Sequence, residues 1–323
     1  MSDSKAQMQD LYRNLAGVVL CQRESLLLTL ATMLCRGHLL IEDVPGLGKT
    51  TLARALARSV KLDFRRLQCT PDLMPSDITG ISVYDSQQHR FQFMQGPVFT
   101  NVLLADEINR ATPRTQSALL EAMAEGTVSM DRETHSLPDP FMVIATQNPV
   151  EFSGTYPLPE AQLDRFFMRI SLGYPDADQE QRIMLAQQSG HPLDALAPVM
   201  DEATLKALQA RCEQVTLSRV MIGYISELVR ATREHDEVRL GASPRGSLAL
   251  MHASRAMAML TGHKAVMPEV VQQLLEPVLA HRLVFRDAAL MRAENREAFW
   301  RELCQQVPVP DHPQAASQAA TAD

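Results

Sequence analysis

The chain of 323 residues is longer than one hydrophobic core usually serves, so we expect two domains. A hydrophobic fraction of 46% and a charged fraction of 21% are typical of a globular protein, and the polar N-terminus lacks the apolar core of a signal peptide. The net charge of −7 and the aromatic fraction of 5% argue against a nucleic-acid-binding protein, which usually has a basic face and base-stacking rings.

Signals for disulfides, metals and membranes are weak. The five cysteines form no CxxC pair, which argues against a disulfide scaffold or a structural zinc site and predicts reduced thiols. The histidines form no HExxH motif, and the most apolar stretch, residues 26–34, is too short to span a bilayer. We therefore expect a cytoplasmic protein without a membrane segment or a His/Cys metal cluster.

The first half of the chain alternates strand-like and helix-like segments. Apolar runs, typical of buried parallel strands, occur at residues 38–42, 102–105, 141–146 and 167–172, and residues 63–69 are expected to form a further strand. Apolar residues with helical spacing mark residues 49–60 and 113–125. This alternation predicts a doubly wound α/β domain with a parallel sheet between helices, interrupted by exposed hairpins at residues 81–93 and 127–137.

The composition changes after residue 174, where strand-like runs disappear. Helical segments, several preceded by an Asp or Ser start signal, are predicted at residues 176–188, 201–213, 218–235, 243–260 and 268–281. We therefore divide the chain into an α/β core with an N-terminal helical segment (1–174), an all-helical lid domain (175–306) and a tail (307–323). The tail is rich in Pro, Ala, Gln and Ser and is expected to be disordered.

A glycine-rich loop, DVPGLGKT at residues 43–50, follows the first predicted strand and opens a predicted helix. This is the context of a P-loop, whose glycines let backbone N–H groups approach phosphates closely. Lys49 is expected to reach the β- and γ-phosphates of ATP, and Thr50 to hold Mg²⁺. Asp43 departs from the generic pattern, which has Gly there. The predicted nucleotide-binding residues are Pro45, Gly46, Leu47, Gly48, Lys49, Thr50, Thr51 and Asp106.

Two acids close the apolar run at residues 102–105, as in a Walker B strand. Asp106 is expected to join Thr50 as a metal-site residue for Mg²⁺, and Glu107 to act as the general base that polarises the attacking water. Asn148 follows the strand at 141–146 and is expected to hold that water or to sense the γ-phosphate. The alternative for Asn148 is an Asn-Pro turn.

Two arginines complete the predicted catalytic set. Arg165 is the candidate arginine finger, which a neighbouring subunit would supply to stabilise charge on the γ-phosphate. Arg245 stands at the head of a helix that Ser243 is expected to cap, and would report the nucleotide state from the lid. The alternative for Arg165 is a surface or salt-bridged arginine, and the alternative for Arg245 is a solvated arginine of the first helical turn.

Together these segments resemble the MoxR family of AAA+ ATPases, in the branch with a helix-2 insert. The likeness covers roughly residues 10–305 and is close at residues 41–50, 104–111, 116–123, 145–149, 154–166 and 241–245. The string GTYPLPEAQLDRF at 154–166 is its most specific part. One departure is Cys21, where family members usually have Gly, in a segment near the adenine.

The resemblance implies a P-loop AAA+ core followed by a helical lid, with residues 81–93 as the helix-2 insert and 127–137 as the hairpin before sensor 1. Asn148 would be sensor 1, Arg165 the trans arginine finger and Arg245 sensor 2. It also implies a hexameric ring, a von Willebrand factor A domain partner, and a chaperone-like ATPase that remodels, matures or activates client proteins.

Three other functions remain open. A magnesium-chelatase-like motor subunit would share the same insert, so only identification of the partner separates it from the leading interpretation. An ATP-binding scaffold without turnover is disfavoured, because it would not need all of the polar residues that hydrolysis requires. These are Lys49, Asp106, Glu107, Asn148, Arg165 and Arg245. A nucleic-acid motor is disfavoured by the acidic charge and the few aromatic residues.

Overall fold

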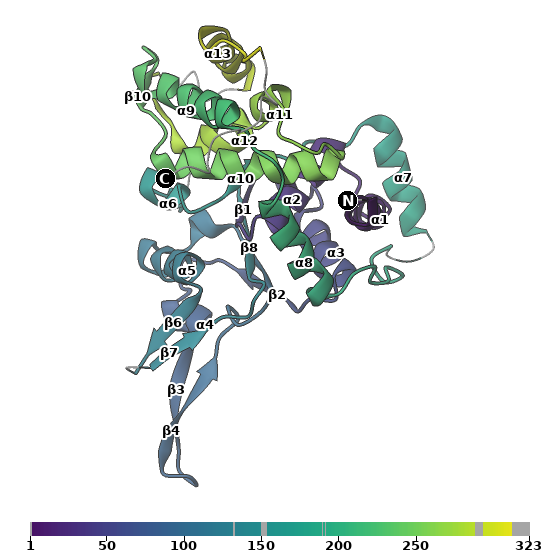
Figure 1. Ribbon diagram of the computed structural model, residues 1–323. Coiled ribbons are helices and arrows are strands. Elements are labelled where there is room, and N and C mark those ends of the chain that lie inside the picture. Colours follow the sequence, from purple (N-terminus) through teal and green to yellow (C-terminus); the bar gives the residue numbers. More distant parts are fainter. Residues whose placement is uncertain are drawn as a thin grey trace, which may run out of the picture.

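The computed structural model describes residues 2–131, 133–149, 154–188, 190, 192–287 and 293–311. At its centre is a five-stranded parallel sheet in the order β2-β5-β8-β1-β9 (Figure 1). The strands are β1 (Leu39–Glu42), β2 (Phe64–Gln68), β5 (Val102–Asp106), β8 (Met142–Gln147) and β9 (Met168–Ile170). They confirm the five predicted strands and the predicted parallel sheet.

Alternate residues of each central strand enter different hydrophobic clusters on the two faces of the sheet. Leu39 and Ile41 of β1 join a cluster with helices α1 (Ser2–Ala16), α2 (Arg23–Leu34) and α3 (Lys49–Ser59). Leu40 points the other way, into a cluster with α5 (Pro113–Glu125). Because side chains of a strand alternate between faces, continuous apolar runs are what a sheet covered on both sides requires.

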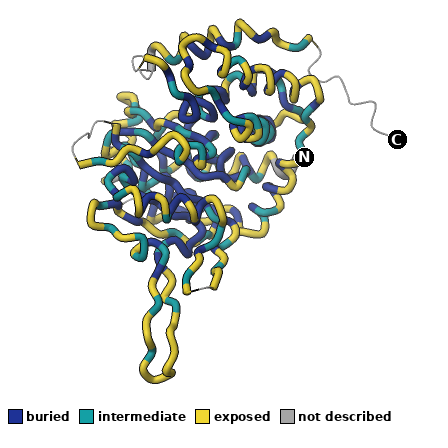
Figure 2. The backbone as a smooth tube through the Cα atoms, turned by 90° about the vertical axis from the view of Figure 1, so that its left-hand side faces the viewer, coloured by how far each residue is buried: buried dark blue, intermediate teal, exposed yellow. Residues whose placement is uncertain are grey.

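Two antiparallel hairpins leave the body on the side of α5. The longer joins β3 (Gly80–Asp85) to β4 (Arg90–Gln95), follows the short helix α4 (Pro75–Thr79), and is exposed along most of its length (Figure 2). The shorter joins β6 (Thr127–Met130) to β7 (Glu133–Ser136). Both predicted hairpins are confirmed, although residue 132 lies outside the described part.

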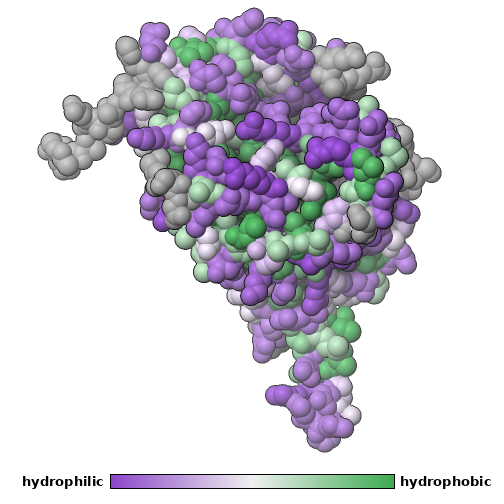
Figure 3. Space-filling view, turned by 90° about the vertical axis from the view of Figure 1, so that its right-hand side faces the viewer, coloured by the Kyte–Doolittle hydropathy of each residue, from purple (hydrophilic) through white to green (hydrophobic). Residues whose placement is uncertain are grey.

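The bases of the two hairpins touch. The ring of Phe93 on β4 stacks on that of His135 on β7, with 4.3 Å between ring centroids. Gly80 is required where the long hairpin begins, because its φ is 108° and a Cβ would lie 2.3 Å from the carbonyl oxygen of Met94. Figure 3 shows apolar side chains along this hairpin and hydrophilic ones at its tip.

The region after residue 174 is mainly helical, as predicted. Its helices are α7 (Ala177–Gln187), α8 (Glu202–Glu213), α9 (Arg219–Glu234), α10 (Pro244–Thr261), α11 (Pro268–Gln273), α12 (Leu275–Leu279), η2 (Ala280–Arg282) and α13 (Ala293–Gln306). Side chains of Asp176, Asp201, Ser218 and Ser243 accept hydrogen bonds from N–H groups of the first helical turn. These caps are the start signals that the sequence displayed.

Three details differ from the sequence prediction. The lid is not all-helical, because β10 (Val238–Leu240) and β11 (Val284–Phe285) form a short antiparallel pair. The predicted helix at 268–281 is broken at Leu274, where α11 ends and α12 begins. Val307, the first residue of the expected tail, is buried; residues 312–323 of that tail lie outside the described residues. The domain boundary at 174 and 175 stays a prediction.

In the described part of the chain, no helix combines the length and apolar character needed to cross a bilayer. Within that same part, no cluster of three or more His, Cys, Asp and Glu side chains could hold a metal ion.

Candidate active site

The loop between β1 and α3 has the conformation of a phosphate cradle. Gly46 and Gly48 have φ angles of 89° and 82°, a region that L side chains rarely adopt. A Cβ at either glycine would meet no atom within 4 Å, so both border open space. Since α3 begins at Lys49, its unpaired N–H groups and the positive end of its dipole lie at this loop. The geometry fits a phosphate chain.

Lys49 is largely buried, with 8% of its surface exposed, and its Nζ donates to the carbonyl oxygen of Asp43 at 2.7 Å. Burial lowers the pKa of Lys49, and the negative charges of Asp43, Asp106 and Glu107 oppose that effect. The ammonium group is therefore held among carboxylates at the carboxyl ends of the strands, where ligands of open α/β sheets bind.

Asp43 stands where the generic P-loop has Gly, and the structure shows what its side chain does. Its carboxylate accepts a hydrogen bond from the hydroxyl of Ser171 at 2.6 Å and another from the N–H of Leu172 at 2.6 Å. These bonds fasten the start of the loop to the chain that leaves β9. Asp43, in the place of the usual Gly, therefore stabilises the entrance of the loop.

Thr146 joins the two acids that follow β5. Because β8 lies next to β5, the fully buried hydroxyl of Thr146 donates to Asp106 Oδ1 at 2.7 Å. The same oxygen accepts the N–H of Glu107 at 2.8 Å. Glu107 has a φ of 57°, unusual for a residue with a side chain, and this hydrogen bond helps to hold that backbone in place.

Three further side chains, which sequence reasoning missed, hold the carboxylates of the two acids. Arg66 on β2 donates to Asp106 Oδ2 at 2.7 Å. Gln68 on β2 and Arg110 in the short helix η1 (Ile108–Arg110) both donate to Glu107 Oε2 at 3.0 Å. The sequence does hold a signal for Arg66 and Gln68: they stand two positions apart in the strand beside β5, so their side chains share one face of the sheet. Gln68 is in register with Asp106.

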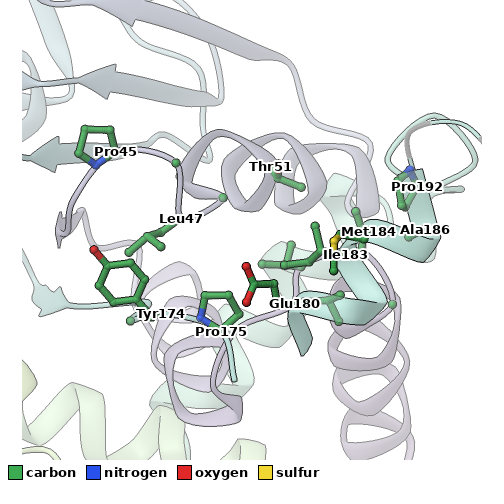
Figure 4. A pocket seen from close by; sticks show the side chains of 17 residues that line it. Pro45, Leu47, Thr51, Tyr174, Pro175, Glu180, Ile183, Met184, Ala186 and Pro192 are labelled. Atoms are coloured by element: carbon green, nitrogen blue, oxygen red, sulfur yellow. The ribbon is translucent and has the colours of Figure 1, made fainter. Parts of the chain in front are cut away.

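A cavity of 590 Å³ lies beside the loop. Its walls are residues 17–20 after α1, the loop residues Pro45–Gly48 and Thr51, residues 173–175, and side chains of and around α7. Figure 4 shows Leu47 and Thr51 on one side and Tyr174, Pro175 and Glu180 on the other. A cavity with mostly apolar walls next to a phosphate cradle has the form of a site for a nucleotide base.

Cys21 follows this wall directly. Its side chain is half-buried and its thiol lies 3.5 Å from the carbonyl oxygen of Gln22. Burial, with a smaller effect of the Asp43 charge, raises the pKa of Cys21 to about 11, so its thiol stays neutral at pH 7. Residues 17–20 line the cavity, and the position of this segment near the base stays a prediction.

The polar residues predicted from the sequence divide into two groups. Lys49, Asp106 and Glu107 come together, and Asn148 is buried at the end of the neighbouring strand β8. Arg165 and Arg245 are exposed, and within the described residues neither shares a hydrogen bond or ion pair with Lys49, Asp106 or Glu107. The guanidinium of Arg165 donates instead to the carbonyl oxygen of Leu120 on α5, at 2.5 Å.

Buried contacts connect the segments that carry the two arginines. Asp164, which ends α6 (Glu160–Leu163), accepts hydrogen bonds from Arg282 Nε at 2.8 Å and from the Ser243 hydroxyl at 3.4 Å. Arg282 also donates to the carbonyl oxygen of Phe166 at 2.7 Å. Burial lowers the pKa of Arg282, and the Asp164 charge opposes the shift. The head of α10 is thereby fixed to the residue that precedes Arg165.

The substitution Thr146→Val tests the role of the shared hydroxyl. Valine keeps the shape of the side chain but leaves Asp106 Oδ1 and the N–H of Glu107 without this partner. We therefore expect the free energy of unfolding to fall by about 2 kcal/mol. If the site hydrolyses ATP, we also expect the rate of hydrolysis to fall roughly tenfold. Thr29→Val is the matched control, because Thr29 is also fully buried but its hydroxyl bonds within α2, to Ser25. Urea unfolding and phosphate release measure both effects; equal behaviour of the two variants would contradict this role.

Known proteins share both the sequence and the fold. Residues 38–168 match the ATPase family associated with various cellular activities, and residues 230–302 match the AAA lid domain. YeaC of Bacillus subtilis is 47% identical, covering 91% of this chain and 92% of its own. Chaperone MoxR1 of Mycobacterium tuberculosis is 39% identical, covering 87% of this chain and 76% of its own. A solved structure from Cytophaga hutchinsonii, of a protein assigned as an ATPase, has a TM-score of 0.87 and 34% identity over 95% of this chain and 96% of its own.

These similarities extend over the strand ends, the glycine-rich loop and the helical lid described above. The order of the sheet strands and the position of the loop between β1 and α3 agree with them. On this combination of sequence, fold and site, the chain belongs to the MoxR family of AAA+ ATPases.

Proposed function

We propose that this protein hydrolyses ATP, with Mg²⁺ as cofactor, at the interfaces between subunits of a ring, and that it uses this cycle to remodel, mature or activate client proteins. The observation that carries the proposal is the meeting of Lys49, Asp106 and Glu107 beside the phosphate cradle and the 590 Å³ cavity. A cradle, a buried cation and two acids at strand ends are the parts that phosphoryl transfer to water requires.

Each residue has a distinct role in this proposal. The backbone of residues 45–51 holds the phosphates, and Lys49 binds the β- and γ-phosphate oxygens. Thr50 and Asp106 hold Mg²⁺, which neutralises charge on the phosphates. Glu107 takes the proton of the attacking water, and Asn148 orients that water.

The contacts of Glu107 support a resting state that must change before hydrolysis. Gln68 and Arg110 occupy one oxygen of its carboxylate, and Arg66 occupies one oxygen of Asp106. A carboxylate oxygen that already accepts two hydrogen bonds has no lone pair left for the attacking water. We therefore expect Glu107 to leave at least one of these partners when it engages the attacking water.

The assembly part of the proposal rests on exposure. Arg165 and Arg245 are exposed in the single chain, so Arg165 is available to the site of a neighbouring subunit and Arg245 can approach the nucleotide from the lid. We propose a hexameric ring in the cytoplasm that works with a von Willebrand factor A domain protein. The name of the relative Chaperone MoxR1 supports a chaperone-like role.

The long hairpin supports contact with another protein. Its exposed apolar side chains are Ile81, Val83, Tyr84, Phe91 and Met94. The strand register puts Ile81, Val83 and Met94 on one face of the hairpin and Tyr84 and Phe91 on the other. Exposed apolar side chains gathered on a projecting element are uncommon where a surface faces only water, and they are typical of protein–protein contact sites. We assign this surface to client or partner binding.

Mixing two inactive variants tests the trans role of Arg165. Arg165→Ala lacks the finger and Glu107→Gln lacks the base, so each alone should hydrolyse ATP at least about 100-fold more slowly than wild type. In a mixed ring, an Arg165→Ala subunit keeps Glu107 and can receive Arg165 from a Glu107→Gln neighbour. We therefore expect phosphate release to recover when the variants are dissociated at low concentration, mixed and concentrated.

The control mixes Arg165→Ala with a chain that carries both substitutions, so that no subunit offers Arg165. That mixture should stay inactive, and Arg230→Ala, which removes an exposed arginine on α9, should retain full activity. Absence of recovery in the first mixture, with subunit exchange verified by a fluorescent label, would contradict the trans role.

A further inference from the structure

Two cysteines far apart in the sequence meet between α2, α8 and α10, which lie side by side (Figure 1). Cys35 caps the C-terminus of α2, and Cys212 lies in the last turn of α8. Both side chains line one cavity and lie close enough for each thiol to shift the pKa of the other. The Cys35 thiol donates to the carbonyl oxygen of His252 on α10, at 3.4 Å. Gln209, one turn before Cys212, donates to the carbonyl oxygen of Met33 at 2.9 Å and so fixes the two helix ends against each other.

The thiols border a cavity of 210 Å³ whose other walls include Glu213, His252 and Arg255. This volume admits small polar molecules of the size of water or peroxide. Arg255 contributes a buried Nε that finds no hydrogen-bond partner among the residues that the structure describes. An unpartnered buried donor is rare in folded proteins. The cavity therefore places the charged Arg255 guanidinium, whose Nε–H meets no acceptor among the described residues, beside the two thiols.

The surroundings make the two thiols unequal. The hydrogen bond from Cys35 lowers the pKa of Cys212, as does the Arg255 charge, and these effects outweigh burial and the Glu213 charge. The hydrogen bond to Cys212, followed by burial, raises the pKa of Cys35. Burial and Arg255 lower the pKa of His252, which leaves its ring neutral at pH 7. Because the Arg255 guanidinium shares the cavity with Cys212 and favours its thiolate, we take Cys212 as the nucleophile of the pair.

We propose that Cys212 and Cys35 form a peroxide-reactive modification site, which closes to a disulfide between α2 and α8. The Cys212 thiolate attacks one oxygen of hydrogen peroxide, the O–O bond breaks, and hydroxide leaves and is protonated to water. The Cys35 sulfur then attacks the resulting sulfenic sulfur. The S–S bond forms, the S–O bond breaks, and the hydroxyl leaves as water with the Cys35 proton. Two electrons pass from the thiols to peroxide, and an added dithiol reverses the reaction.

The position of the disulfide gives it a consequence for the nucleotide site. Cys35 is three residues before His38, and β1 leads directly into the P-loop. The bond would tie this approach to α8, in the region that we assign to the lid. Slower ATP hydrolysis after oxidation is the expected result, and only this consequence rests on the proposed function.

The test treats the purified full chain with hydrogen peroxide and follows its intact mass. We expect the loss of two hydrogen atoms, and peptide mapping after thiol blocking should identify a Cys35–Cys212 crosslink that dithiothreitol removes. Cys35→Ser should instead accumulate a sulfenic acid at Cys212, which dimedone traps, and Cys212→Ser should yield neither product. Cys304 in α13 is the internal control: it is half-buried, and therefore more accessible than the buried Cys212, but burial raises the pKa of its thiol. We expect it to react about tenfold more slowly than Cys212.

The proposal is wrong if Cys212 reacts no faster than Cys304, or if the crosslink forms only in urea. Hydrolysis by the crosslinked protein is measured separately. If oxidation lowers the rate of wild type, dithiothreitol restores it, and Cys35→Ser shows no such loss, the disulfide slows ATP hydrolysis as expected. An unchanged rate after crosslinking would overturn this effect on the nucleotide site. An absence of hydrolysis in the reduced protein would contradict the proposed ATPase function and leave the mass result intact.

Discussion

Replacing Glu107 with glutamine is expected to lower the rate of ATP hydrolysis by about 10²–10⁴-fold and to leave ATP binding in place. The amide has nearly the shape of the carboxylate but cannot accept a proton from water. The backbone hydrogen bond from Glu107 to Thr146 does not involve the substituted group, so the turn after β5 should keep its geometry. Steady-state phosphate release measures the rate, and calorimetric titration with MgATP measures the binding.

Glu234→Gln is the matched control for this substitution. Glu234 is an exposed acid at the end of α9 that pairs with Arg230 across 3.7 Å. The rate of that variant should equal that of wild type. If Glu107→Gln hydrolysed ATP at more than about a tenth of the wild-type rate, Glu107 would not be the general base.

Replacing Lys49 with alanine is expected to remove most of the ATP affinity itself. A lysine ammonium that bonds to phosphate oxygens contributes roughly 1.5–3 kcal/mol per charge-assisted hydrogen bond, so we expect affinity to fall about 100-fold. The folded protein should tolerate the change. Within the described residues the Lys49 ammonium donates to one backbone carbonyl alone, and burial opposes its charge. Hydrolysis at subsaturating ATP should fall at least as far.

Thermal unfolding with and without MgATP checks this result. Ligand that binds only the folded state raises the melting temperature, so wild type should shift and Lys49→Ala should not. Lys206→Ala is the control, since Lys206 is a partly exposed lysine on α8 that pairs with Glu202 at 2.9 Å. An equal shift in Lys49→Ala and wild type would remove Lys49 from the phosphate site.

The main architecture was predictable because the signals that determine it are local. The central strands β1, β5 and β8 appear in the sequence as apolar runs because both faces of the sheet are covered there, whereas the edge strand β2 is mostly polar and exposed. The helix starts are marked by Asp or Ser caps. β10 and β11 were missed because strands of three and two residues carry no periodicity. The break at Leu274 was missed because the local pattern remains helical across it.

The candidate site was predictable where its residues share one motif. The glycines with positive φ, Lys49 and the two acids stand in short strings beside predicted strands. Thr146 could not be assigned in this way, because its partners lie on the neighbouring strand, about 40 residues earlier in the sequence. The function of Asp43 depends in the same way on Ser171, which only the folded chain brings near.

The meeting of Cys35 and Cys212 had no sequence signal either. Their separation along the chain matches no thiol motif, and helix packing alone joins α2 to α8. The sequence prediction that the thiols are reduced agrees with the free cysteines of the structure. The proposed disulfide therefore concerns a second, oxidised state of the protein.

The specific rate of ATP hydrolysis by the full chain, measured with Mg²⁺ over a range of protein concentrations, tests the central claim most directly. In the proposed mechanism Arg165 comes from a second subunit, so we expect the rate per chain to rise with concentration until the proposed ring is complete. Glu107→Gln should stay at background throughout. A rate per chain that is the same at every concentration, down to those at which only monomers are present, would contradict a site shared between subunits. A protein that binds ATP but releases no phosphate at any concentration would contradict the ATPase function itself.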